Sequence, residues 1–295
     1  MDKITEKQNP KSNNLDKMTT IEILDLINQE DAIIHSEIKK SIPKIEKMID
    51  EIVFNIKNGG RIIYVGCGTS GRIGVLDASE CPPTFSVDKN LVQGIIAGGD
   101  SALKNAIENI EDSFSEGAKD ILLKNVKNND SVIGISANGS AKYVHGALSE
   151  AKKNNALTAL ITFNNYVKDD YLDHLIITIV GPEIISGSTR MKAGTATKMI
   201  LNMISTTVMI KLNKVFKNYM VDLNVSNQKL YSRAINIISD ITNLNSKKSK
   251  ILLTNAKGNV KCAIVMNALD IDYKKSLQLI EELDGNIRNI IDIVD

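Results

Sequence analysis

The hydrophobic positions between residues 61 and 179 come in short continuous runs, and each run is followed by a stretch with helical spacing. Short apolar runs rich in β-branched residues are typical of strands that are buried on both faces. Strands that alternate with helices indicate a parallel sheet with helices on both sides. We therefore predict an α/β fold with a doubly wound, parallel five-stranded sheet. The strands are expected near Arg61–Val65, Leu91–Ile96, Ser131–Ile135, Leu157–Thr162 and Leu175–Ile179.

The helical periodicity also predicts helices before, between and after these strands. Thr19 and Glu22 form a capping box that begins a first helix, and a second short helix is expected over residues 31–40. Pro43 then opens a third helix, since proline is tolerated in a first helical turn, and Gly59 ends it. Further helices are expected near Ser70–Ala78, Ala102–Ile110, Ser140–Lys153 and Arg190–Asn213, with several more after residue 215.

These patterns divide the chain into four parts. Residues 1–18 are polar and are expected to form a flexible tail, and residues 19–58 to form the N-terminal helices. The sheet with its helices occupies residues 59–215. Residues 216–295 are expected to form a C-terminal helical region.

The composition excludes several classes of partner. Of the 295 residues 43% are hydrophobic, and 36 Lys and Arg residues are balanced by 35 Asp and Glu residues. This balance does not favour nucleic acid or a membrane surface as a partner. The apolar tract at residues 199–212 is too short and too often interrupted by polar residues to span a bilayer. Three cysteines without C-x-x-C pairing, and a polar N-terminus without a signal sequence, indicate a cytoplasmic protein.

The strongest local signal for a ligand lies where the first predicted strand ends, in Gly66-Cys67-Gly68-Thr69-Ser70-Gly71. A strand, a glycine turn and a helix together direct backbone N–H groups at an anion. The three glycines also fit a dinucleotide-binding pattern, but the next strand ends in Ala97-Gly98-Gly99 and offers no acidic residue for a ribose. We therefore favour a phosphate site, with a tight turn that binds no ligand as the alternative. The turn at residues 136–140 follows another strand and is expected at the same edge of the sheet.

Three segments resemble signatures of the N-acetylmuramic acid 6-phosphate etherases, a family within the sugar-isomerase (SIS) superfamily of phosphosugar-binding domains. The segments are GCGTSGRIGVLDASECPPTF (66–85), SGSTRMKAGT (186–195) and NYMVDLNVSN (218–227). The similarity runs from about Thr19 to near the C-terminus, in the same order and without large gaps. It identifies residues 59–215 as an SIS domain and implies a ubiquitin-associated-like (UBA-like) bundle near the end of the chain.

The resemblance implies a lyase. The family removes the D-lactyl ether from N-acetylmuramic acid 6-phosphate by elimination across C2–C3 and addition of water, and gives N-acetylglucosamine 6-phosphate and D-lactate. This chemistry needs a base and an acid, which two carboxylates supply, and no cofactor or metal. Glu80 matches the family's catalytic acid, and Glu111 matches its second catalytic glutamate, a candidate base. Judged by position alone, Glu80 is equally compatible with a solvated charge in a Pro-flanked loop. For Glu111, which lies among Glu108 and Asp112, position alone favours a charge on a helix face, and only the resemblance distinguishes it from its neighbours.

The resemblance also implies a set of substrate contacts. The matching residues are Gly68, Thr69, Ser70, Ser136, Asn138, Gly139, Ser140, Ser188 and Lys192. In the second turn the family carries Ser-Gly-Arg-Thr-Pro, so Asn138 and Ala141 stand where two hydroxyl residues are usual. Ser136, Ser140 and Lys142 are candidates to replace the missing donors. For Ser188 and Lys192, a helix cap and a solvated cation are the alternative roles.

The expected partners are a small-molecule sugar phosphate and, because SIS domains usually pair, a second copy of the chain in a homodimer. One rival function is a non-catalytic sugar-phosphate sensor, since the same superfamily contains the glucokinase regulatory protein. Another is an aldose–ketose isomerase. A sensor has no need of Glu80, and an isomerase should lack the ASECPP block. Cys67 and Cys81 are expected to pack rather than to act as nucleophiles, because no histidine is near them in sequence.

Overall fold

Five parallel strands form the main sheet of the protein. The computed structural model describes every residue except 1–2, 108, 224, 226 and 293–295. The strands follow the spatial order β2-β1-β3-β4-β5, and every neighbouring pair is parallel. The predicted parallel five-stranded sheet is thus confirmed. The strands are β1 (Ile62–Gly66), β2 (Val92–Ile96), β3 (Ser131–Ile135), β4 (Leu157–Thr162) and β5 (His174–Ile177).

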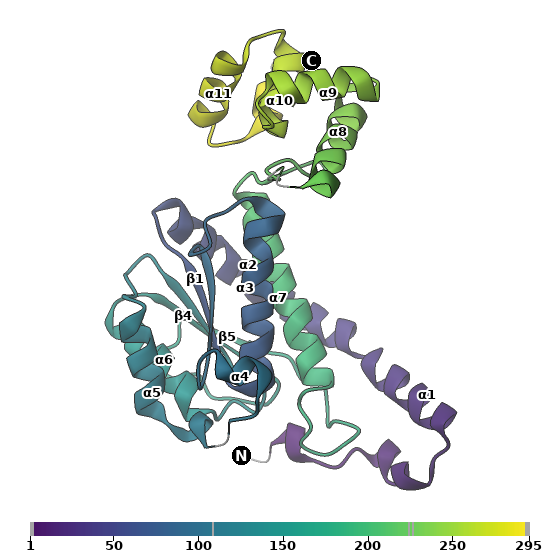
Figure 1. Ribbon diagram of the computed structural model, residues 1–295. Helices are drawn as coiled ribbons and strands as arrows, with labels where there is room; N and C mark the ends of the chain where they lie inside the picture. Colours follow the sequence, from purple (N-terminus) through teal and green to yellow (C-terminus); the bar gives the residue numbers. More distant parts are fainter. Residues whose placement is uncertain (1–2, 108, 224, 226, 293–295) are drawn as a thin grey trace. The chain divides into compact units, whose positions relative to one another are not determined.

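Helices cover both faces of this sheet, because alternate residues of each buried strand point to opposite sides. Figure 1 shows α5 and α6 on one side, and α3 and α7 on the other. Ile63 and Val65 of β1 pack in the cluster that contains the side chains of α6. Between them, Tyr64 lies on the opposite face, close to Gly74 of α3. The helices are α3 (Gly68–Phe85), α5 (Phe114–Leu123), α6 (Lys142–Lys153) and α7 (Lys192–Lys211).

One long helix replaces two that we expected before the sheet. Helix α2 (Ile34–Lys57) runs without a break through Pro43, so the prediction that this proline opens a helix is wrong. A proline inside a helix removes one hydrogen bond and costs about 3 kcal/mol. Buried residues on both sides of Pro43, among them Ile38 and Ile45, offset this cost, since each buried isoleucine contributes about 1.5–3 kcal/mol.

Helix α3 also continues through prolines, at Pro82 and Pro83, to Phe85. Cys81 and Phe85 are one turn apart and both are buried, which favours helix over loop in this last turn. Glu80 therefore lies in a helix, and the expected Pro-flanked loop is not formed. Between β2 and β3, the expected long helix is reduced to α4 (Ser101–Lys104) and the 3-10 turn η4 (Ile110–Asp112), and α5 was not anticipated.

The segment before the first helix is folded rather than loose. Residues 4–17 contain the 3-10 turns η1 (Ile4–Glu6), η2 (Pro10–Ser12) and η3 (Leu15–Lys17). Thr5 is 0% exposed and Asn9 is 4% exposed, so this part of the expected tail is packed against the rest of the chain. The capping box then begins α1 (Thr20–Asp31) as predicted, with the Thr19 N–H donating to Glu22 Oε2 at 2.7 Å.

The chain divides into two compact units, which differ from the predicted boundaries. One unit comprises Met1–Ser79 and Lys89–Ser205, and the other comprises Glu80–Asp88 and Thr206–Asp295. Helices α3 and α7 each begin in the first unit and end in the second. Within the described residues, no helix has both the length and the apolar composition that a membrane span requires.

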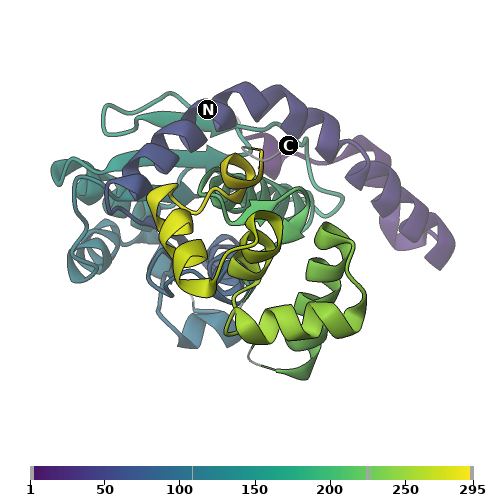
Figure 2. The ribbon, with the colours of Figure 1, turned by 90° about the horizontal axis from the view of Figure 1, so that it is seen from above.

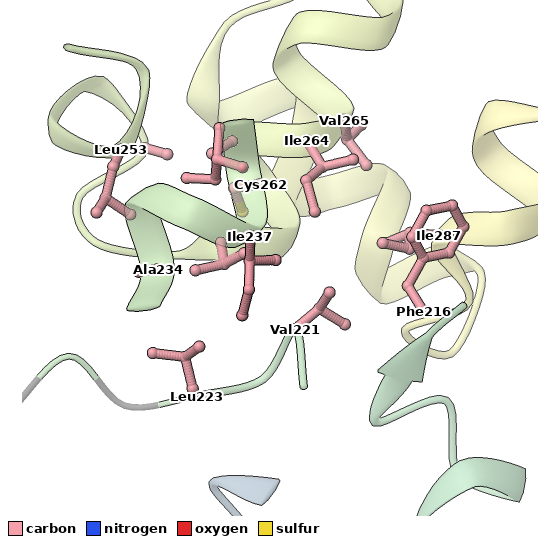
Figure 3. Close-up of a cluster of buried hydrophobic side chains, with 14 of the residues drawn as sticks. Phe216, Val221, Leu223, Ala234, Ile237, Leu253, Cys262, Ile264, Val265 and Ile287 are labelled. Atoms are coloured by element: carbon pink, nitrogen blue, oxygen red, sulfur yellow. The ribbon is translucent and has the colours of Figure 1, made fainter. Parts of the chain in front are cut away.

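The second unit contains a helical bundle and a two-stranded ribbon (Figure 2, green to yellow). Helix α10 is buried on nearly all sides, as expected for the central helix of a bundle. Figure 3 shows Cys262, Ile264 and Val265 of α10 among apolar side chains of the surrounding elements. The elements are β6 (Val215–Phe216), β7 (Tyr219–Met220), α8 (Gln228–Thr242), α9 (Ser246–Asn255), α10 (Val260–Leu269), α11 (Tyr273–Glu282) and α12 (Ile287–Ile291).

Glycines allow α5 and α6 to pack closely. Substituting one of these glycines tests this packing. A Cβ atom on Gly117 would lie 1.9 Å from the Tyr143 carbonyl oxygen. Because backbone atoms cannot move aside cheaply, we expect Gly117→Ala to lower the free energy of unfolding by about 1–3 kcal/mol. Urea unfolding measures this change, with Lys119→Ala on the exposed side of α5 as the control. An unchanged urea midpoint for Gly117→Ala would contradict the close packing.

Candidate active site

Two turns meet at the carboxyl ends of β1 and β3. These strands are neighbours, and Gly66 at the end of β1 is in register with Ile135 at the end of β3. The chain leaves β1 toward β2 on one side, whereas β3 lies on its other side, so this is the topological switch point of the sheet. Ligands of open α/β sheets bind at such a point. The first turn (residues 67–70) and the second turn (residues 136–140) therefore lie next to each other, as predicted.

The first turn leaves donors free for a ligand. Gly66 and Gly71 have no room for a Cβ atom, because each would meet backbone of the other at 2.6 Å, and this tightness sets the start of α3. The first N–H groups of a helix have no partner within it. Neither the Thr69 nor the Ser70 hydroxyl is hydrogen-bonded to another described residue. Both side chains are half-buried, so the turn presents two hydroxyl donors, whereas the Ser70 N–H already donates to the Cys67 carbonyl at 3.1 Å.

A cavity of about 360 Å³ opens beside the first turn. Gly68 and Arg72 of α3 line one wall, and Glu111 of η4 lines another. The Arg72 side chain holds the intervening loop, since its Nε donates to the Leu103 carbonyl at 3.1 Å and its Nη2 to the Asn105 carbonyl at 2.9 Å. The structure thus brings the predicted base Glu111 to the same cavity as the predicted phosphate turn.

Cys67 lies in the wall of the same cavity as a protonated thiol. Burial, with the negative charge of Glu111 as a second cause, raises the pKa of Cys67 to about 12. A thiol is nucleophilic only as the thiolate, so the expectation that Cys67 is not a nucleophile is supported. Glu111 lines the same cavity as Cys67, so its negative charge acts on the thiol.

The second turn is organised by Asn138. Its side-chain oxygen accepts from the Ser140 N–H and from the Ser140 hydroxyl, each at 3.0 Å, and from the Ser136 hydroxyl at 3.4 Å. The Ser136 oxygen in turn accepts from the Ala141 N–H at 3.3 Å, one residue before α6. Asn138 therefore stabilises the turn from within, and both serine hydroxyls that could replace the missing donors are bonded to it.

A side-chain network behind the second turn fixes the Gly139 carbonyl. The His145 Nε2–H donates to that carbonyl at 2.9 Å, and His145 Nδ1 lies 2.8 Å from the Tyr171 hydroxyl. The Tyr166 and Tyr171 hydroxyls donate to Asp169 Oδ2 at 2.6 and 2.7 Å. Burial, followed by the Asp169 carboxylate, raises the pKa of both tyrosines, so they remain hydroxyl donors. Sequence reasoning missed this network, because no spacing pattern links residues 139, 145, 169 and 171.

The block at residues 186–195 reaches the first turn through Gly194. A Cβ atom on Gly194 would lie 3.5 Å from Cγ2 of Thr69. The start of α7 is capped by Glu183, which accepts from the Lys192 N–H at 2.9 Å and the Ala193 N–H at 3.0 Å. Ser188 lies half-buried in the loop just before this helix.

Lys192 does not contact this cavity. It is 1% exposed, and its ammonium donates to Glu30 Oε2 at 2.6 Å. Burial raises the pKa of Glu30, but hydrogen bonds from Lys192, Lys11 and Asn9 outweigh this and lower it. Lys192 thus has a packing role in place of the substrate contact that we expected, because its charge is already neutralised inside the protein.

Glu80 is exposed and lies on α3, ten residues after Ser70 in the sequence. The two predicted catalytic glutamates are therefore carried by different elements, α3 and η4. Among the described residues, no group of three or more His, Cys, Asp or Glu side chains is placed to hold a metal ion.

Comparisons with known proteins first define a class. Residues 44–152 match the family model of the glucokinase regulatory protein N-terminal SIS domain, and residues 217–283 match that of the C-terminal lid domain of glucokinase regulatory protein. A solved phosphoheptose isomerase from Neisseria gonorrhoeae is 16% identical with a TM-score of 0.48, over 64% of this chain and 98% of that chain. The two family models identify an SIS domain and a C-terminal lid domain in this chain.

Longer matches define the family within this class. The N-acetylmuramic acid 6-phosphate etherase of Caldanaerobacter subterraneus is 50% identical over 99% of this chain and 96% of its own length. The Bacillus subtilis protein of the same name is 46% identical over 98% of this chain and 95% of its own length. The chain belongs to the N-acetylmuramic acid 6-phosphate etherase family.

The interaction between Glu111 and Cys67 can be tested by alkylation. With a pKa of about 12, Cys67 is almost entirely protonated at pH 8, and we expect slow reaction with iodoacetamide. Glu111→Gln removes a negative charge that raises this pKa, so the thiolate fraction and the rate should increase. Mass spectrometry of Cys67 over a range of pH measures the rate, with Glu116→Gln as the control. Equal alkylation rates of Cys67 in the wild type and in Glu111→Gln would show that Glu111 does not raise the pKa of this thiol.

We expect the loss of a hydrogen bond in the network behind the second turn to weaken the affinity for phosphate. His145→Leu removes the donor to the Gly139 carbonyl, and a lost hydrogen bond of about 0.5–1.5 kcal/mol predicts a roughly 2- to 10-fold weaker affinity for inorganic phosphate. His145→Gln keeps an N–H donor and should retain most of the affinity. His174→Leu is the matched control, since His174 begins β5 at the opposite edge and pairs with Glu51 at 3.2 Å. If calorimetry gives His145→Leu the same affinity for inorganic phosphate as the wild type, the hydrogen bond from His145 to the Gly139 carbonyl does not support phosphate binding.

Proposed function

We propose that the protein is a lyase that cleaves the D-lactyl ether of N-acetylmuramic acid 6-phosphate to give N-acetylglucosamine 6-phosphate and D-lactate. Identity of 50% over 99% of the chain to a curated etherase carries this proposal. The rival function as a non-catalytic sensor has no comparable support, because the match to the glucokinase regulatory protein is confined to separate domain models. The role is in amino-sugar catabolism of cell-wall material, in the cytoplasm.

In this proposal the two turns bind the 6-phosphate. The start of α3 offers Gly68 and the hydroxyls of Thr69 and Ser70, which are not hydrogen-bonded to another described residue. A phosphate at this position also interacts favourably with the helix dipole. The second turn contributes Ser136, Asn138, Gly139 and Ser140, and Ser188 adds a contact from the block next to Thr69.

Glu111 is the proposed base that removes the C2 proton. It lines the cavity that Gly68 also lines, so a sugar whose phosphate is held by the first turn has its ring within reach of this carboxylate. General base catalysis requires a carboxylate placed at the proton that it removes. A cavity of about 360 Å³ has room for one hexose phosphate.

Glu80 is the proposed acid that protonates the departing lactate oxygen. Glu80 belongs to the second compact unit, whereas Ser70 and Glu111 belong to the first. We propose that Glu80 of one chain serves the phosphate turns of a second copy, in a homodimer. This arrangement lets one subunit bind the phosphate and its partner supply the acid.

Two variants test the two roles. General acid and base catalysis each contribute about 10²–10⁴-fold, so Glu80→Gln and Glu111→Gln should each lose lactate release by that factor and keep substrate affinity. In deuterated water, Glu111→Gln should also stop deuterium uptake at C2 of N-acetylglucosamine 6-phosphate, whereas Glu80→Gln should retain it. Glu116→Gln, an exposed carboxylate paired with Lys119, is the control. Wild-type protein that releases no D-lactate would refute the function, and normal turnover of either variant would refute its role.

Mixed dimers test whether Glu80 and Glu111 of one active site come from different chains. If Glu80 acts in the partner's site, a dimer of one Glu80→Gln chain and one Glu111→Gln chain has one intact site, and mixing the two inactive proteins restores lactate release. If both glutamates act within one chain, every site of the mixed dimer is damaged and the mixture stays inactive. The second result would overturn the shared site but not the reaction.

A further inference from the structure

The residues before α1 touch the second turn. The Lys3 ammonium donates to the Ser140 hydroxyl at 2.6 Å, across 137 positions of sequence. Ser140 belongs to the second turn, at the switch point of the sheet. A cation is therefore placed at one of the two turns of the proposed site.

A buried anchor two residues further on holds Lys3 in this position. Thr5 is fully buried, and its N–H donates to Asn164 Oδ1 at 3.1 Å, while Asn164 Nδ2 donates back to the Thr5 hydroxyl at 2.9 Å. The same Asn164 amide donates to the Ala137 carbonyl within the second turn at 3.3 Å. The segment and the turn thus share one buried amide, which fixes their relative position.

The segment is also tied to the block at residues 186–195. The Gly187 N–H donates to the Thr5 carbonyl at 3.2 Å. Further along, Asn9 Nδ2 donates to Glu30 at 2.8 Å and to the Pro182 carbonyl at 3.2 Å. Residues 3–9 therefore run between the second turn and the block at residues 186–195, and hydrogen bonds of Thr5 and Asn9 hold them in place.

Charge distinguishes Lys3 from the other cations considered for this site. Lys192 is neutralised by Glu30, Lys142 lies 3.7 Å from Asp112, and Arg72 is bonded to two carbonyls. Lys3 is bonded to a neutral hydroxyl and forms no ion pair with another described residue. Its charge is thus available to an anion at Ser140.

We propose that Lys3 is a substrate-binding residue whose ammonium contacts the phosphate held at the second turn. The inference rests on the proposed function for the identity of the ligand, and it extends the site to a segment outside the SIS domain. Lysine binds phosphate as a point charge, so it needs no bidentate geometry and can act from the end of a short anchored segment. Lys3 thereby adds a positive charge to a turn whose serine hydroxyls already donate to Asn138.

The test compares Lys3→Gln, Lys3→Arg and Lys17→Gln. We expect Lys3→Gln to raise KM about 10- to 100-fold with nearly unchanged kcat, because the phosphate is remote from the bond that breaks. The affinity for inorganic phosphate should fall by a similar factor. Lys3→Arg keeps the charge and should retain most of the affinity. Lys17→Gln removes the same charge from an exposed position of the same segment and should behave as the wild type.

A double-mutant cycle between Lys3 and Thr5 tests whether the Lys3 charge acts only when Thr5 holds the segment in place. Thr5→Val removes the hydroxyl that accepts from Asn164 Nδ2, although the backbone N–H bond to Asn164 Oδ1 remains, and should weaken phosphate binding by itself. Adding Lys3→Gln to Thr5→Val should then have a smaller effect than Lys3→Gln alone, because the ammonium is held less firmly at the turn. Wild-type affinity of Lys3→Gln, or an equal loss in Lys17→Gln, would overturn the proposal. Because phosphate affinity is measured without turnover, this result is independent of whether the wild type releases lactate.

Discussion

The position of β1 between β2 and β3 is the constraint on which the site depends. A parallel strand whose chain leaves toward one neighbour, while the next strand pairs on its other side, opens a crevice at the carboxyl ends. Both turns that follow these strands carry hydroxyl side chains, and the first turn leads into the N-terminus of α3, where the helix dipole favours negative charge. The crevice is therefore complementary to an anion before any particular side chain is considered.

Side chains outside the sheet then fix the two turns. Asp77 of α3 accepts from Asn202 at 2.7 Å and Ser205 at 3.1 Å, which holds α3 beside α7. The buried carboxylate of Glu30 accepts hydrogen bonds from Lys192, Lys11 and Asn9. Removing one partner of such a buried pair leaves an uncompensated charge, which costs about 3–5 kcal/mol. The N-terminal segment is therefore part of the folded unit, and its ends are located by buried polar contacts.

The sequence predicted what depends on local pattern. The five strands follow from apolar runs, and the two turns follow from glycine and hydroxyl residues at strand ends. Local rules were misleading at Pro43 and Pro82, because buried apolar side chains on both sides kept the helices intact. The expected tail at residues 1–18 contains Thr5 and Asn9, whose burial depends on Asn164 and Glu30, partners that lie far away in sequence. Lys192 was taken for a substrate contact because its neutralising partner, 162 positions away, could not be inferred from sequence.

We infer that the two turns form one phosphate site. A crystal structure of the protein with glucosamine 6-phosphate, which has no lactyl ether to lose, shows directly where the phosphate binds. We expect phosphate oxygens within hydrogen-bonding distance of Ser70 and Ser140, the Lys3 ammonium in contact with the same phosphate, and the sugar ring directed toward Glu111. A phosphate bound away from the switch point, for example at the amino ends of the strands near Lys152, would show that the two turns do not form this site.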